Sequence, residues 1–152
     1  HAWRLGGNAD WNTHTVHNAC PHLQKLNGGS WLALEFKTGK WADKYGKVWI
    51  ICGPVINNLA PTEWVGDPGE IKAVVPDAFF KIVVKESGDN FYILAFLFSK
   101  DDEAGRKANL EQYLTSVDNI EQLTGIDFLT SLADSIEENL EGKTASELWD
   151  GS

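Results

Sequence analysis

The sequence predicts an α+β fold in which helices flank a central antiparallel sheet. Three apolar segments enriched in β-branched and aromatic residues have the length of buried strands: Lys47–Cys52, Phe79–Lys85 and Phe91–Ser99. Two further segments, 28–38 and Phe128–Leu140, space their apolar residues as a helix does when one side packs on a core.

The first third of the chain is expected to run from an irregular loop into a helix and then a strand. Residues 1–17 are rich in Gly, Asn, Asp and His and show no regular periodicity, which is typical of a loop. In the helix that follows, Gly28 and Gly29 either cost stability or permit a close approach of another backbone segment. The next strand is predicted to end at Gly53-Pro54.

Turn-forming residues divide the middle of the chain. A loop is expected over residues 55–71, which contain two Pro and two Gly, and a short strand follows at Ala73–Val75. The segment Glu86–Asn90 predicts a hairpin turn between the two long apolar strands.

The C-terminal third is predicted to begin with a short edge strand at Tyr113–Val117. Asp118 and Glu121 have the spacing of a capping box, and Gly125 is a helix stop. The last ten residues, 143–152, are expected to form a frayed tail.

Length and composition predict a single domain over residues 1–142. Of the 152 residues, 43% are apolar and 23% are charged, which is typical of a globular protein. No apolar run approaches the length of a transmembrane helix, and no basic region followed by an apolar stretch predicts a signal peptide. The compartment stays open, with a secreted or periplasmic location favoured over a cytoplasmic one.

The net charge of −9 argues against a protein that coats nucleic acid through a broad basic face. It leaves room for an enzyme that uses a metal ion and a few local cations. Lys37–Lys47 contains four Lys against one acid, Asp43. This segment suits contacts with phosphate, or it is a solvated surface turn.

Two cysteines, Cys20 and Cys52, do not make a disulfide framework, although they could pair with each other. Because Cys52 lies in the apolar run VWIICGP, it is predicted to be a small buried hydrophobic residue.

Residues 18–35 carry the strongest chemical signal. Asn27 and Glu35 are eight positions apart, which in a helix corresponds to about 12 Å along the axis and roughly 80° beyond two full turns. Both side chains are therefore expected to face one cleft. Carboxamide and carboxylate oxygen atoms are the ligands that Mg²⁺ prefers, with Mn²⁺ or Ca²⁺ as substitutes.

The same stretch contains the pattern N-x-x-P followed by L-N-x-G-x-W-x-x-L-E. It resembles the DNA/RNA non-specific endonucleases, the sugar-non-specific nucleases of the ββα-metal (His-Me finger) class. The segments VPDAFFK and VDNIEQLTGIDF resemble later parts of the same family. The resemblance implies a ββα-metal nuclease fold and a magnesium-dependent endonuclease that hydrolyses DNA and RNA with little sequence specificity.

The resemblance also implies a role for each matching residue. Asn27 matches the direct metal ligand, and Glu35 matches the residue that hydrogen-bonds metal-bound water and orients it. Asn18 matches an asparagine that positions the phosphate or the histidine. His1 matches the histidine that acts as general base.

The family's Asp-Arg-Gly before that histidine and its N-terminal strands are absent from this chain. Either a separate N-terminal fragment or a homodimer partner supplies them, or His1 is not the family histidine. Arg4, Lys37 and Lys40 are candidates for contacts with the substrate phosphates. His22 stands where the family usually has Gln, and it is the next candidate base.

Three other interpretations use the same residues. The chain could be a catalytically inactive nucleic-acid-binding or interaction module of the same fold. His14, His17, Cys20 and His22 lie within nine residues and could bind Zn²⁺, although the spacing is unlike common zinc motifs. An N-terminal His1 could also chelate copper with a second histidine.

Overall fold

A computed structural model describes residues 20–56, 61, 63–88 and 90–149 of the 152-residue chain. The helices are α2 (Gln24–Asn27), α3 (Ser30–Tyr45), α4 (Val117–Thr124) and α5 (Asp134–Glu141), with a 3₁₀ turn at Leu110–Tyr113. The strands are β1 (Trp49–Val55), β2 (Trp64–Val65), β3 (Ala73–Val74), β4 (Ala78–Ser87), β5 (Asn90–Ser99) and β6 (Leu114–Thr115).

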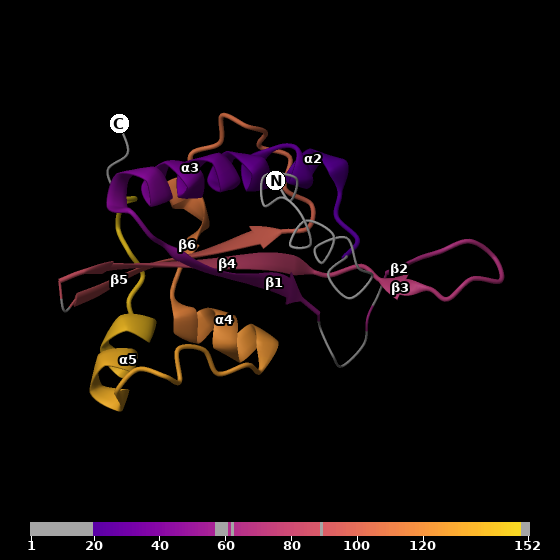
Figure 1. Ribbon diagram of the computed structural model, residues 1–152. Coiled ribbons are helices and arrows are strands. Elements are labelled where there is room, and N and C mark those ends of the chain that lie inside the picture. Colours follow the sequence, from indigo (N-terminus) through magenta and orange to yellow (C-terminus); the bar gives the residue numbers. More distant parts are fainter. Residues whose placement is uncertain (1–19, 57–60, 62, 89, 150–152) are drawn as a thin grey trace, which may run out of the picture.

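The main sheet has four antiparallel strands in the order β1-β4-β5-β6, and β2 pairs with β3 in a separate hairpin. Helix α3 covers one face of the sheet, and α4 and α5 lie on the opposite face (Figure 1). Covering both faces explains why β4 and β5 are apolar almost throughout, since every side chain of a two-sided strand meets a core. The predicted α+β architecture with a central antiparallel sheet flanked by helices is confirmed.

The alternation of side chains along the strands produces two cores. The α3-side core contains Phe79 and Val83 of β4, alternate residues of β5, and apolar residues of α3; the buried members are Leu26, Trp31, Leu34, Trp41, Phe79, Val83, Leu94, Phe96, Phe98, Leu110 and Tyr113. The α4-side core contains the intervening residues of the same strands; its buried members are Val55, Phe80, Ile82, Val84, Ala95, Val117, Ile120 and Phe128.

Strand β1 differs from its prediction in two ways. It continues through Gly53 and Pro54 to Val55, and most of its residues are exposed or half-buried, with only Val55 buried. Proline is tolerated there because β1 is an edge strand of the described sheet, so one side of it has no ladder to donate to. The apolar sequence of β1 therefore correctly predicted a strand, but the prediction that this strand is buried is wrong.

The predicted helix over residues 28–38 is two helices in the structure. Helix α2 ends at Asn27, Gly28 and Gly29 separate the helices, and α3 begins at Ser30 and extends to Tyr45. A Cβ atom on Gly29 would lie 2.3 Å from the Lys25 carbonyl oxygen and 3.1 Å from the Gly105 Cα. Of the two roles expected of these glycines, the close backbone approach is the one observed.

The C-terminal elements correct two predictions and confirm a third. Ser116, not Asp118, caps α4, because its hydroxyl accepts a hydrogen bond from the Asn119 backbone at 3.2 Å. Gly125 ends the helix in the left-handed conformation, with a φ of 69°, as predicted. The helix expected over Phe128–Leu140 begins only at Asp134.

Residues 145–149 do not form the frayed tail that was expected. Ala145, Leu148 and Trp149 pack against the α3-side core. The Trp41 indole donates a hydrogen bond of 2.9 Å to the Trp149 carbonyl oxygen, which ties this segment to α3.

Candidate active site

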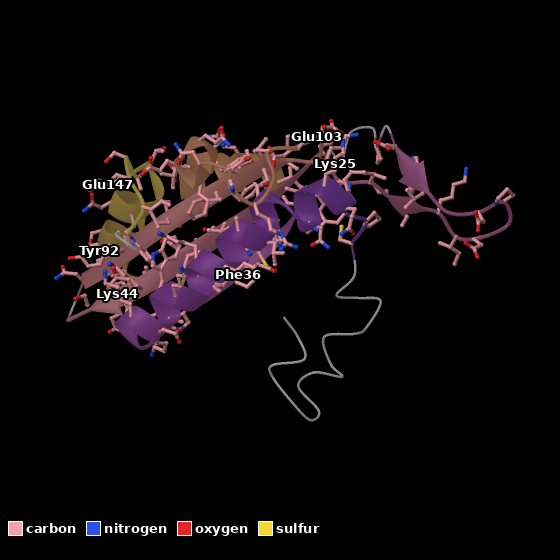
Figure 2. The ribbon with its side chains drawn as sticks, turned by 90° about the horizontal axis from the view of Figure 1, so that it is seen from above. Lys25, Phe36, Lys44, Tyr92, Glu103 and Glu147 are labelled. Carbon is pink, nitrogen blue, oxygen red and sulfur yellow. The ribbon has the colours of Figure 1, made fainter. Side chains whose placement is uncertain are left out.

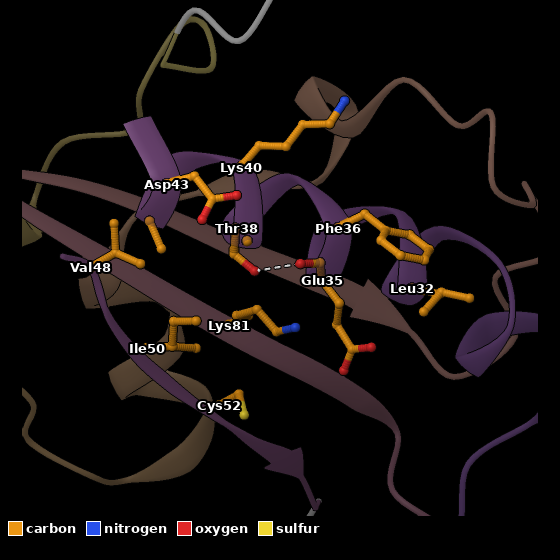
Figure 3. Close-up of a pocket in the computed structure, with 12 residues that line it drawn as sticks. Leu32, Glu35, Phe36, Thr38, Lys40, Asp43, Val48, Ile50, Cys52 and Lys81 are labelled. Carbon is orange, nitrogen blue, oxygen red and sulfur yellow. Dashed lines mark hydrogen bonds between the residues drawn. The ribbon is translucent and has the colours of Figure 1, made fainter. Parts of the chain in front are cut away.

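A groove of about 590 Å³ lies between α3 and the strands β1 and β4. One wall is the exposed side of α3 from Leu32 to Asp43, and the other is formed by Val48, Ile50 and Cys52. The groove opens along β1, which is an edge strand of the described sheet and has mostly exposed or half-buried residues. Figure 3 shows Glu35 of α3 and Lys81 of β4 pointing into this space.

Lys81 is a buried cation at the base of the groove. Only 3% of the residue is exposed, and its ammonium lies 4.1 Å from the centroid of the Trp31 ring. Lys81 pairs with Cys52 across the β1–β4 ladder, and its side chain emerges on the same face of the sheet as Phe79 and Val83. The position is set by the two-residue period of the strand.

Glu35 is the acidic partner of this cation. Burial lowers the pKa of Lys81, whereas the negative charge of Glu35, and to a smaller extent Cys52, raises it. The Glu35 carboxylate is half-buried and has access to the groove. The site therefore combines a half-buried carboxylate with a lysine that is 3% exposed and still borders the groove.

His22 adds a third titratable group. Its ring centroid lies 3.8 Å from that of Phe79 and 5.3 Å from that of Trp31. Burial lowers the pKa of His22; Glu35 opposes this shift and Lys81 adds to it. Its Nε2 atom is buried without a hydrogen-bond partner. A neutral imidazole with an unpaired nitrogen is able to accept a proton.

The start of α3 is fixed by the loop that follows β5. Asp102 accepts hydrogen bonds from the Ser30 hydroxyl and, at 2.8 Å, from the Tyr113 hydroxyl. The Arg106 Nε donates to the Gly28 carbonyl oxygen at 2.9 Å. Lys25 and Glu103 form an ion pair of 2.6 Å on the surface nearby (Figure 2). These contacts hold the α2–α3 junction, and with it the groove wall, in one position.

Asn27 is the last residue of α2 and its side chain is exposed. It is not one of the residues that line the groove, and the break at Gly28-Gly29 means that the eight-residue helical spacing to Glu35 does not hold. Asn27 and Glu35 nevertheless both offer hard oxygen atoms that water can reach. Oxygen atoms of this kind are the ligands that Mg²⁺ takes, one or two from the protein with several waters retained, but the structure does not bring Asn27 into the groove with Glu35.

The predicted substrate lysines lie along α3. Lys40 is exposed and lines the groove. Lys37 is half-buried, with its ammonium 6.0 Å from the Trp41 ring centroid. Gly39 lies between them on the same helix, with open space around its Cα. Of the two predicted lysines, only Lys40 contributes to the groove wall.

Neither cysteine is buried, and the two do not form a disulfide with each other. Cys20 and Cys52 are free thiols and both are exposed. The prediction that Cys52 is buried is wrong, because the edge position of β1 leaves its side chain in the groove.

Several predicted site residues lie outside the part of the chain that the structure describes. They are His1, Arg4, Asn18, and the two zinc candidates His14 and His17. The roles assigned to them stay predictions, as does the zinc interpretation that combines them with Cys20 and His22.

Lys81 borders the groove beside Glu35 but is not among the site residues predicted from the sequence. The sequence predicts the segment Phe79–Lys85 only as a buried strand. The sequence does contain a signal for Lys81. In a strand it lies on the same face as Phe79 and Val83, where burying an unpaired charge costs free energy.

The comparisons with known proteins agree on one family. The sequence profile described as DNA/RNA non-specific endonuclease matches residues 2–135. The chain belongs to the DNA/RNA non-specific endonuclease family. Asn27, Glu35 and Lys81 all lie within the matched residues.

Two curated relatives carry the name nuclease. The protein from Serratia marcescens is 30% identical over 144 residues, which are 91% of this chain and 52% of the relative. The protein from Nostoc sp. is 26% identical over 140 residues, which are 86% of this chain and 48% of the relative. The chain thus spans about half the length of the curated relatives it matches.

A solved structure supports the fold. The crystal structure of the EndoG/EndoGI complex contains a chain that matches with a TM-score of 0.68 at 18% identity, covering 88% of this chain and 57% of that one. The prediction of a ββα-metal nuclease fold is confirmed. No helix in the described residues is both long and apolar enough to cross a membrane.

Proposed function

We propose that the protein is a magnesium-dependent endonuclease that hydrolyses phosphodiester bonds of DNA and RNA with little sequence specificity. The observation that carries this proposal is the Glu35 carboxylate in an open groove beside the buried Lys81 ammonium, within a chain of the DNA/RNA non-specific endonuclease family.

The residues divide the work. Asn27 and Glu35 would hold Mg²⁺, Asn27 directly and Glu35 through water; when bound, the ion neutralises charge on the phosphate and on the leaving oxygen. Glu35 orients a water molecule by accepting its hydrogen bond. Lys81 supplies a positive charge that interacts with Glu35 at the base of the groove.

Other side chains carry out proton transfer and substrate binding. His1 takes a proton from the attacking water, with His22 as the alternative base. Lys40 contacts the phosphate backbone from the groove wall, and Arg4 and Lys37 bind further phosphates. Contacts with phosphates carry no information about base sequence, which agrees with low specificity.

Plasmid nicking and RNA degradation in Mg²⁺ test the proposal, with a chelator as the blank. Asn27→Ala is expected to abolish activity mainly by losing metal, so excess Mg²⁺ partly restores it. Gln24→Ala, an exposed change on the same short helix, is the matched control and should keep full activity.

His1→Ala is expected to lower the rate without weakening metal binding. If His1→Ala leaves the rate unchanged, the general base must be another histidine, either His22 or one of His14 and His17. Plasmid and RNA that stay intact with the purified protein, both alone and after an N-terminal segment is restored, would contradict the proposed activity.

A further inference from the structure

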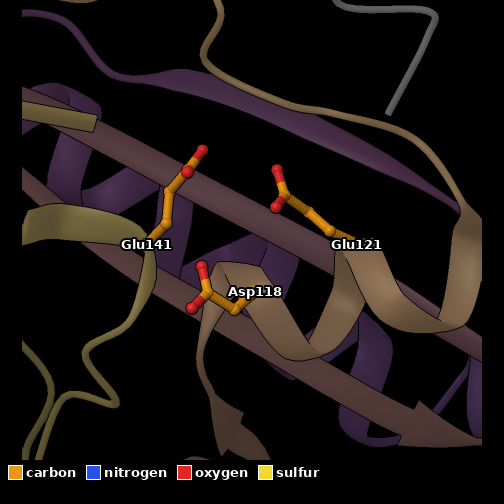
Figure 4. A group of neighbouring side chains, drawn as sticks. All are labelled: Asp118, Glu121 and Glu141. Atoms are coloured by element: carbon orange, nitrogen blue, oxygen red, sulfur yellow. The ribbon is translucent and has the colours of Figure 1, made fainter. Parts of the chain in front are cut away.

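Five carboxylates gather on the face of the sheet opposite the groove. Asp118, Glu121 and Glu141 each place an oxygen atom within 4.8 Å of the others, and so do Asp127, Glu137 and Glu141. Asp118 and Glu121 belong to α4, and Glu141 is the last residue of α5. Figure 4 shows the side chains of Asp118, Glu121 and Glu141 directed toward a common space.

Glu141 lies at the centre of this cluster and is only 7% exposed. Its Oε1 atom is buried and has no hydrogen-bond partner. A buried carboxylate oxygen without a partner is costly unless a proton or a cation neutralises it. Burial first, and then the charges of the four other carboxylates, raise the pKa of Glu141 to about 7.

The central three carboxylates have no cationic partner among the described residues. No described lysine or arginine side chain forms an ion pair with Asp118, Glu121 or Glu141. Lys143, the nearest in sequence, donates instead to the Asn139 side chain. Helix α5 also has no basic residue in its last turn, although the C-terminal end of a helix favours positive charge.

The cluster is held in place by the backbone around it. The Phe128 backbone N–H donates a 2.8 Å hydrogen bond to Glu121 Oε1, which fixes that carboxylate. Asp118 lies close to the end of α5, since a Cβ on Gly142 would be 3.4 Å from its Oδ2. The ligand atoms therefore come from two helices whose relative position a bound ion would fix.

We propose that Asp118, Glu121 and Glu141 form a calcium-binding site, separate from the nuclease groove, that clamps the end of α5 to α4. Two oxygen atoms that both bind Ca²⁺ at about 2.4 Å lie at most about 4.8 Å apart, which matches the spacing of the three carboxylates. Three carboxylates at one point suit Ca²⁺, which takes six to eight oxygen ligands, better than Mg²⁺, which keeps most of its waters. Asp127 and Glu137 add negative charge on the other side of Glu141.

Thermal unfolding of the purified, chelator-treated protein tests the site, with CaCl₂ as the probe. The Asn27→Ala background weakens the proposed catalytic metal site, so a response that Glu141→Gln removes reports the cluster. At a Ca²⁺ concentration about a hundredfold above Kd, the expected rise in Tm is roughly 5–10 °C. Calorimetric titration of the same protein should give one strong site.

Glu141→Gln should eliminate the rise in Tm, whereas Glu138→Gln, an exposed change on the same helix, should retain it. Asp118→Asn, at an exposed position, gives a second variant if Glu141→Gln does not fold. A Tm that does not respond to Ca²⁺, a response that survives Glu141→Gln or Asp118→Asn, or an equal response to Mg²⁺ at the same concentration would overturn the proposal. Activity toward nucleic acid plays no part in this readout.

Discussion

Replacing Lys81 by Met is expected to make the protein more stable and less active. Removing the buried ammonium, which is 3% exposed, recovers a desolvation cost of several kcal/mol per ion. It loses the interaction with the Trp31 ring at 4.1 Å, worth about 0.5–2 kcal/mol. Met has a similar length and is apolar, so the free energy of unfolding should rise. The rise should be smaller than the about 1–4 kcal/mol seen when both ions of a buried pair are replaced, because the half-buried Glu35 stays charged.

Catalysis should respond in the opposite direction. Without Lys81, Glu35 loses the positive charge with which it interacts at the base of the groove. Partners of this kind change metal affinity or activity by about 10- to 100-fold when removed. Because the variant is more stable, a fall in kcat of this size could not be attributed to unfolding.

The pH dependence provides an independent check. The pKa of Lys81 is lowered in the folded protein, so the unfolded chain binds more protons between the lowered pKa and the ordinary value of about 10.4. Wild-type stability should therefore rise with pH across that window and fall as pH decreases through the lowered pKa. Lys81→Met should not show this slope.

Urea unfolding at several pH values, together with plasmid nicking, measures all three effects. Lys72→Met, an exposed change, is the matched control and should alter neither stability nor rate appreciably. Full activity in Lys81→Met, or a loss of stability with an unchanged pH slope, would refute the reasoning.

Two further predictions concern the elements around the groove. Gly29→Ala should lower the free energy of unfolding by about 1–3 kcal/mol, since its Cβ would meet the Lys25 carbonyl oxygen at 2.3 Å. Gly39→Ala, in open space on α3, should raise it by about 1 kcal/mol; urea melts in which both variants behave alike would contradict the close-packing argument. His22→Gln should reduce the loss of stability in acid, because burial lowers the pKa of His22 and wild type loses up to about 1.4 kcal/mol per pH unit below pH 6.5. Stability curves that coincide between pH 4 and 7 would show that His22 is not desolvated.

The sheet and its strand boundaries follow largely from local sequence. Strands β4 and β5 combine β-branched and aromatic residues with a turn at the correct place, and the observed Ala78–Ser87 and Asn90–Ser99 contain both predicted segments. Such signals depend on residues that are close together in the sequence, so the sequence alone reveals them. Exposure depends on what covers a strand, which explains why β1 was predicted correctly as a strand and wrongly as buried.

For the candidate site, the sequence alone indicated the residue types. The carboxamide of Asn27 and the carboxylate of Glu35 are visible in the motif between residues 18 and 35, and the family they indicate is confirmed. The spacing predicted that both residues lie on one continuous helix. The structure instead interrupts the helix at Gly28-Gly29, where Gly29 lies close to the Gly105 backbone. That approach joins residues 76 positions apart, beyond the reach of any local pattern.

Only the tertiary structure assembled the rest. The pairing of Cys52 with Lys81 across the β1–β4 ladder, and the packing of Trp31 over that lysine, place a buried cation beside Glu35. Tertiary packing also brings the carboxylates of α4 close to Glu141 of α5. Charge and residue type belong to the sequence, whereas burial and proximity, which determine what a charge can do, arise when distant segments pack together.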